Sequence, residues 1–139
     1  MKDHAPVAVP EKGMVPVVSA TTQNNGVTGF AHGPAQFPAN CLTVANGGNG
    51  SGCTFYHQYP FHAVSQATVL CPKFAMTPLA GLFLTVVINR EKPKYSFSRR
   101  LSLERLQEIS IRLPVDVAGQ PDCRFMDTYL RRLRVANLN

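Results

Sequence analysis

Hydrophobic and polar residues alternate with a short period along the first half of the chain. Apolar runs rich in β-branched and aromatic residues occupy residues 41–45, 53–57, 61–64 and 66–71. Such side chains alternating with polar ones are typical of half-buried strands. Residues 14–20 form a similar run, and we expect an edge strand there because Pro16 cannot donate to a ladder. Polar residues 21–26 follow as a loop that closes on Asn-Gly, a strong turn signal.

The period becomes helical in the second half. Thr77 and Pro78 are typical of an N-cap and a first helical position, and apolar residues follow at helical spacing. Ser102 predicts the N-cap of a second, short helix, and residues 109–113 predict one more strand. Pro121 and Asp122 predict the start of a last helix. Its apolar residues share one face, namely Phe125, Met126, Tyr129, Leu130 and Leu133.

This order of elements predicts an α+β fold, a twisted mixed β-sheet body with late helices. We expect a flexible leader at residues 1–12, the body at residues 13–120 and a C-terminal helix at residues 121–139. With 139 residues, 45% hydrophobic and 16% charged, the chain has the size of one domain and too much apolar content for disorder. Its longest apolar run, residues 79–88, is about half of what a membrane span needs. No signal peptide is visible, so a cytoplasmic location is expected.

Positive charge is concentrated in the second half of the chain. The net charge is +6, and residues 90–139 hold eleven basic and six acidic residues. A basic half suggests a polyanionic partner. A solvated basic surface explains the same charge equally well.

Two polar segments are candidates for contacting such a partner. Residues 46–52 are glycine-rich but lack the Gly-Lys-Ser/Thr ending and the following helix of a nucleotide-binding loop. They are therefore either a flexible hairpin connection or a loop that brings bare backbone N–H groups close to a flat or anionic surface. Residues 94–100 interleave cations, hydroxyls and aromatics, which suits phosphate contacts and guanine reading. The alternative is a basic surface turn in which Tyr95 and Phe97 anchor the core.

Signals for catalysis are poor. The chain has no G-x-S-x-G motif, no methyltransferase signature and no glycine motif for a methyl donor. His57 and His62 are expected to be packed or rim histidines. The four cysteines (Cys41, Cys53, Cys71 and Cys123) are widely spaced without a C-x-x-C motif, which favours buried free thiols over a zinc site. The sequence thus predicts a binding protein without metal or cofactor.

Several segments, read in order, resemble one family. They are residues 17–29, 42–56, 94–100, 111–116, 119–122 and 125–130. Together they resemble the target recognition domain of restriction–modification specificity subunits, of the type I kind and its type IIB and IIG relatives. The resemblance covers residues 13–134 of the sequence.

The resemblance implies a non-catalytic module that reads duplex DNA through loops and positions a separate adenine methyltransferase or nuclease. The expected DNA-binding residues are Thr21, Thr22, Gln23, Asn24, Asn25, Asn46, Asn49, Ser51, Lys94, Tyr95, Ser96, Ser98, Arg99 and Arg100. It also implies that the last helix starts a spacer or dimerisation helix, which would pack against a methyltransferase subunit, a second specificity half or another copy. The expected interface residues are Tyr129, Leu130 and Leu133.

Two other interpretations stay open at this point. Typical specificity subunits have two recognition domains, whereas this chain carries one domain and the beginning of a spacer, so it could be a half-subunit or a truncated remnant. A remnant would retain only contacts with partner subunits and not bind DNA. The second interpretation is a small enzyme that uses the glycine-rich loop with His57 and His62.

Overall fold

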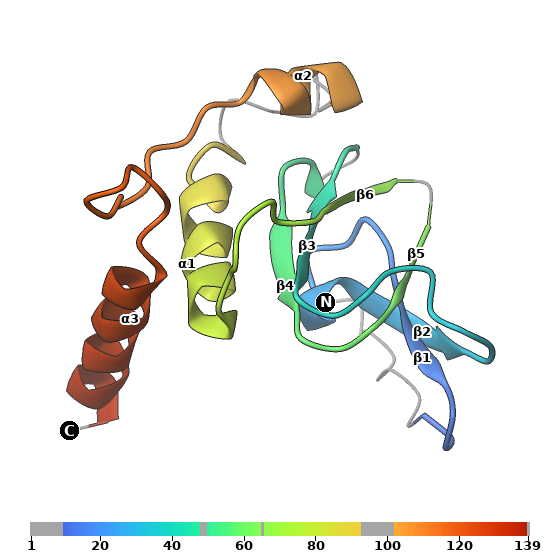
Figure 1. The fold of residues 1–139 in the computed structure, drawn as a ribbon. Coiled ribbons are helices and arrows are strands. Elements are labelled where there is room, and N and C mark those ends of the chain that lie inside the picture. The colour runs from blue at the N-terminus through green and yellow to red at the C-terminus, as the bar shows by residue number, and fades with distance from the viewer. Residues whose placement is uncertain (1–9, 48–49, 65, 93–101, 139) are drawn as a thin grey trace.

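The computed structural model describes residues 10–47, 50–64, 66–92 and 102–138, with side chains up to residue 133 (Figure 1). The elements, in chain order, are β1 (Val15–Val18), the short 3-10 helix η1 (Asn24–Gly26), β2 (Val27–Ala31), β3 (Cys41–Ala45), β4 (Thr54–His57), β5 (His62–Ala63), β6 (Ala67–Leu70), α1 (Pro78–Asn89), α2 (Leu103–Glu108) and α3 (Cys123–Leu138). Strands come first and helices late, which confirms the α+β class.

The strands form two three-stranded sheets, ordered β2-β1-β5 and β4-β3-β6. The second is antiparallel throughout, whereas β1 runs antiparallel to β2 and parallel to β5. The prediction that β1 is an edge strand was therefore wrong. Pro16 fits a middle strand because β5 pairs only with Val17 and Val18, so no ladder partner faces the proline from that side. β2 was not predicted, although the Asn-Gly turn before it is a hairpin signal.

β3 is the centre of the molecule, and all five of its residues are buried. Leu42 packs with Tyr56 and with α1, whereas Cys41 packs with Val18 and Phe61 from the side of the other sheet. The expectation of half-buried strands was wrong for β3 because both of its faces are covered. Figure 1 shows α1 lying between this sheet and α3.

The two long helices are joined at the beginning of α1. The Thr77 hydroxyl caps α1 by accepting from Ala80 N at 3.2 Å, as the sequence predicted. The same hydroxyl donates to Asp127 Oδ1 on α3 at 2.5 Å. Met126 of α3 is completely buried in the core cluster that also contains α1. The C-terminal helix is therefore fixed to the body at its first turns.

The connection between α2 and α3 differs from the prediction. Ser102 caps α2 through Arg105 N, as predicted. Residues 109–113 are not a strand, however, and the only pairing described nearby is an isolated bridge from Val115 to Pro121. Asp116 stabilises the tight turn between the two bridge residues, because its Oδ1 accepts from the N–H groups of Ala118 and Gln120. None of the helices in the described ranges is long and apolar enough to cross a membrane.

Candidate nucleic-acid interface

The loop between β1 and β2 lies against the turn between β3 and β4. A Cβ placed on Gly50 would lie 3.5 Å from Thr22 Cγ2 and 3.7 Å from the Thr21 carbonyl carbon. The bare backbone of the glycine-rich segment is thus packed on the first polar segment. Two of the three segments that the sequence nominated for DNA contact are therefore neighbours in space.

Lys92, the last described residue before the third segment, also packs on the glycine-rich turn. Gly52 has a φ of +85°, and a Cβ there would lie 3.3 Å from Lys92 Cα. Lys92 Nζ also donates to Cys53 Sγ at 3.3 Å. Residues 93–101 are outside the described residues, so Lys94, Tyr95, Ser96, Ser98, Arg99 and Arg100 have no assigned positions. Lys92 was not among the predicted site residues, although it lies only two residues before the start of the basic segment and that closeness was a usable signal.

The β1–β2 loop turns sharply at three consecutive residues of left-handed conformation. The φ values are 51° for Asn24, 55° for Asn25 and 80° for Gly26. Asparagine tolerates this region better than most residues, and Gly26 has a second reason, because a Cβ there would lie 3.0 Å from Val18 Cγ1. The turn leaves Thr22, Gln23, Asn24 and Asn25 exposed to solvent. The first three side chains are open to contact with a partner.

Asn25, by contrast, is tied to the body. Its Nδ2 donates to the Tyr56 carbonyl at 2.9 Å. The carbonyl of the next residue, His57, accepts from Asn40 N on the β3 side. Because successive carbonyls of a strand point in opposite directions, the Tyr56 carbonyl points to the outer edge of β4. Asn25 therefore shapes the loop by closing part of a sheet edge.

A second asparagine closes the same edge further along. Asn89, the last residue of α1, donates from Nδ2 to the Thr54 carbonyl at 3.0 Å and accepts at Oδ1 from Thr54 N at 2.9 Å. This pair of hydrogen bonds reproduces what a neighbouring strand would supply. Since open edges invite pairing with other chains, the two asparagines protect β4.

The three residues of the glycine-rich segment that were predicted to bind DNA differ in their surroundings. Asn46 Nδ2 donates to Thr68 Oγ1 at 3.3 Å, which joins the loop to β6. Ser51 is only 3% exposed, so its side chain lies inside the turn. Asn49 is outside the described residues.

The two histidines do not form a reactive centre. His57 Nε2 lies 2.8 Å from Thr43 Oγ1, and its ring packs on Phe61 with 4.6 Å between ring centroids. Burial lowers the pKa of His57 to about 4, so the imidazole is neutral at physiological pH. The His62 Nε2 atom is buried and has no hydrogen-bond partner among the described residues. His57 is a packed histidine, as predicted.

The cysteines differ from the prediction of buried thiols. Cys41 is buried, but Cys53 and Cys123 are half-buried and Cys71 is exposed. Cys71 becomes exposed because it follows β6 instead of belonging to it. All four are free thiols. Within the described ranges, no three His, Cys, Asp or Glu side chains are grouped as a metal site would require.

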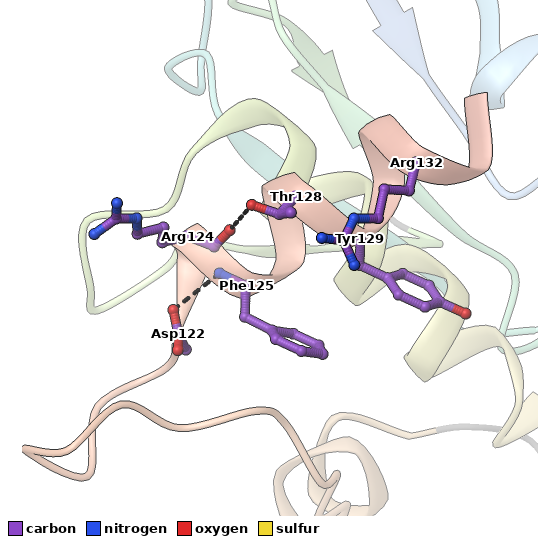
Figure 2. Close-up of a pocket in the computed structure, with 6 residues that line it drawn as sticks. All are labelled: Asp122, Arg124, Phe125, Thr128, Tyr129 and Arg132. Carbon is purple, nitrogen blue, oxygen red and sulfur yellow. Dashed lines mark hydrogen bonds between the residues drawn. The ribbon is translucent and has the colours of Figure 1, made fainter. Parts of the chain in front are cut away.

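α3 presents a second surface, apart from the loops. Figure 2 shows Phe125 and Tyr129 with their rings on the same side of the helix, near Arg132, and the ring centroids are 6.3 Å apart. Phe125 is 51% exposed and Tyr129 47% exposed, whereas Met126 of the same predicted stripe is buried. The stripe is therefore split between a core contact and an open face.

The open face continues into a groove between α1 and α3. The groove has a volume of about 260 Å³ and is lined by Phe83, Val86, Val87, Arg90, Phe125, Tyr129, Leu130 and Leu133. All three residues predicted for the partner interface are among these. Exposed apolar patches of this kind, rimmed by charge, are typical of protein contacts.

Comparison with known proteins shows what this chain is similar to. The family described as the type I restriction modification DNA specificity domain matches residues 7–138. The specificity subunit S.BcgI of a type II restriction enzyme from Heyndrickxia coagulans is 36% identical over 126 residues, which is 87% of this chain and 36% of that protein. A crystal structure of the S subunit of a type I restriction–modification system from M. genitalium is similar in fold. It has a TM-score of 0.53 at 17% identity and covers 75% of this chain and 29% of that one.

The chain thus spans well under half the length of either relative. The family match nevertheless extends over nearly all of it, including every strand and helix of the described structure. The chain therefore belongs to the family of type I restriction–modification DNA specificity domains.

Proposed function

We propose that the chain reads its duplex DNA target with the loops at the end of the molecule where Thr22, Gly50 and Lys92 meet. The observation that supports this proposal is that the β1–β2 loop, the glycine-rich turn and Lys92, two residues before the basic segment, are neighbours there. Of the two long described helices, α1 is packed between β4 and α3, and the exposed arginines of α3 stand beside the rings of Phe125 and Tyr129, a mixture that suits a protein partner better than base edges. We therefore assign recognition to loops and not to one inserted helix.

Within these loops we assign different roles to different residues. Thr22, Gln23 and Asn24 are exposed, and their amides and hydroxyl suit hydrogen bonds to base edges. Lys94, Arg99 and Arg100 supply charge for the phosphates, with Tyr95, Ser96 and Ser98 between them. Asn25, Asn46 and Ser51 hold the loops in shape, and Asn49 supplies a further amide for base edges.

A salt titration of DNA binding tests the placement of the phosphate contacts. For the double variant Arg99→Glu with Arg100→Glu we expect weaker binding to any duplex. The slope of log K against log salt should also flatten by about two units, because each lost phosphate contact removes about one. The matched control is Arg124→Glu with Arg132→Glu on α3, which changes the net charge equally. An equal loss in both variants would mean that only net charge matters and would contradict the proposal.

Sequence-specific reading requires a separate measurement. Selection of bound duplexes from a random-sequence pool should enrich one consensus, and Gln23→Ala or Asn24→Ala should change or relax it. A pool without enrichment at any salt concentration would leave only non-specific binding and contradict the assignment.

We also propose that the groove between α1 and α3 receives a helix from a second specificity half or from a second copy of this chain. The support is that Tyr129, Leu130 and Leu133 lie along one side of it, and that the relative S.BcgI is much longer than this chain. In this arrangement a methyltransferase subunit acts on the DNA that the loops hold. Because the target is cellular DNA, we place the assembly in the cytoplasm.

A further inference from the structure

Two of the four cysteines stand opposite each other at the end of a β ladder. β3 and β6 pair with Leu42 opposite Leu70, so Cys41 and Cys71 occupy the next position of the same register. Their sulfur atoms are 3.0 Å apart. Directly opposite residues of antiparallel strands have Cα atoms about 4.5–5.5 Å apart, which lies inside the range that a disulfide spans.

The surroundings of the two sulfurs differ. Cys71 is exposed, whereas Cys41, the first residue of the central strand β3, is only 2% exposed. Burial, with the Cys71 sulfur adding to it, raises the pKa of the Cys41 thiol to about 12. A reagent from solution therefore reacts first with the Cys71 sulfur, and the buried Cys41 sulfur can react only with Cys71.

The other two cysteines have different neighbours. Cys53 Sγ accepts from Lys92 Nζ, and Cys123 Sγ donates to the Ala75 carbonyl at 3.5 Å. Of the cysteines, all of which the structure describes, only Cys41 and Cys71 have a thiol as their hydrogen-bond partner.

We propose that Cys41 and Cys71 are a site of reversible oxidation, at which a low-molecular-weight disulfide such as oxidised glutathione converts the dithiol into an intramolecular disulfide. The Cys71 thiolate attacks one sulfur of the small disulfide, forms a mixed disulfide and releases one small thiol. The Cys41 sulfur gives up its proton and attacks Cys71 Sγ, and the second small thiol leaves. The protein loses two electrons and two protons, and both appear in the two small thiols.

The bond would cross-link β3 to the segment that leads from β6 into α1. This segment is already held by Asn40, whose Nδ2 donates to the Met76 carbonyl at 2.8 Å. The oxidised chain should therefore keep its fold and lose conformational freedom in the unfolded state, which raises its melting temperature. The proposal does not depend on DNA binding.

The test uses the whole chain with oxidised glutathione. Titratable thiols should fall from four to two per chain, the intact mass should fall by two hydrogen atoms, and peptide mapping should link Cys41 to Cys71. The melting temperature should rise by about 5 °C or more and return to its first value with dithiothreitol. Cys71→Ser should abolish the change and should fold, because the side chain is exposed. The matched control Cys53→Ser should leave the cross-link unchanged.

Three results would overturn the proposal. A glutathione adduct that stays on Cys71 would show that Cys41 does not complete the exchange. A cross-link that involves Cys53 or Cys123, or four titratable thiols after treatment, would show that the pair is not the oxidation site.

Discussion

Gly81 sets the distance between α1 and the central sheet. A Cβ at this position would lie 2.5 Å from Tyr56 Cε2 and closer still to Cδ2, well inside contact distance, and the ring is buried. Alanine normally stabilises a helix by about 1 kcal/mol relative to glycine. Here overpacking costs about 1–3 kcal/mol. We therefore expect Gly81→Ala to lower the free energy of unfolding, against the helix propensity, in urea titrations.

A second glycine provides the control for this prediction. At Gly29 in β2, a Cβ would have no other atom within 4 Å, and the backbone φ is not positive. Gly29→Ala should therefore leave the free energy of unfolding unchanged within about 0.5 kcal/mol. If Gly81→Ala proves as stable as Gly29→Ala, the close packing of Tyr56 on α1 is wrong.

His57 should make stability depend on pH in a specific window. Its pKa is about 4 in the folded chain and near the ordinary 6.5 when unfolded. Between these values the unfolded chain binds more protons, so stability is complete above pH 6.5 and falls as the pH decreases toward 4. The loss should approach about 3 kcal/mol at most. Subtracting the pH profile of His57→Gln from that of the native chain isolates this contribution, and identical profiles would contradict it.

At this scale, the sequence predicted local features well. The caps Thr77 and Ser102 are read from two or three neighbouring residues, and both were confirmed. The packing of Gly81 on Tyr56 joins positions far apart in sequence, and no local pattern announces it. The same holds for the pairing of Cys41 with Cys71.

Among the elements, the edge of β4 depends on a helix. The Asn89 side chain supplies both hydrogen bonds to the completely buried Thr54. Asn89→Ala would leave a backbone donor and a backbone acceptor without partners, and each costs about 1–3 kcal/mol when buried. We expect the free energy of unfolding to fall by about 2–4 kcal/mol, measured by chemical denaturation.

The neighbouring residue Arg90 serves as the control. It is exposed at the same helix end, so Arg90→Ala should change stability by less than about 0.5 kcal/mol. Equal effects of the two variants would show that the end of α1, and not the amide pair, is what matters.

The elements themselves were partly predictable. Strand β3 was predicted over residues 41–45, as observed, and helix α1 was predicted with the observed start at Pro78. The role of β1 as a middle strand was missed, since it depends on a parallel pairing with a two-residue strand much later in the chain. The false strand at residues 109–113 has the right apolar residues but no ladder partner among the described segments.

For the whole molecule, the proposed docking groove predicts an association. Leu130→Asp with Leu133→Asp should abolish it, because each buried leucine contributes about 1.5–3 kcal/mol. Sedimentation across a concentration range measures the association, alone and with a co-expressed second specificity half or methyltransferase. A monomer under all of these conditions would contradict the proposal.

Two controls separate lost docking from lost folding. Circular dichroism should show the strand-rich body intact in the double variant. Collapse of the fold would mean that the two leucines pack in the core of the domain itself and not against a partner. Val117→Asp places one aspartate on a fully exposed apolar residue outside the groove. This variant should associate like the native chain.

The DNA-facing end shows the limit of sequence reasoning at this scale. Composition nominated the glycine-rich and basic segments and the family resemblance added residues 21–25, but neither states that Gly50 packs on Thr22 or that Lys92 packs on Gly52. Those contacts follow from the hairpins, which bring distant loops to one end. Nor does composition separate exposed Gln23 from buried Ser51.

The turn at Asn24, Asn25 and Gly26 has a consequence for how target choice could be altered. Asn25 and Gly26 are held by the body of the protein, whereas the side chains of Thr22, Gln23 and Asn24 extend into solvent. Under the proposed function, new specificities are accessible by randomising three adjacent codons while the two that follow are kept. In a library that also varies Asn25 and Gly26, most members would lose the hydrogen bond that closes the β4 edge or would strain the turn at Gly26. The loop thus separates mutational freedom from structural constraint within five residues.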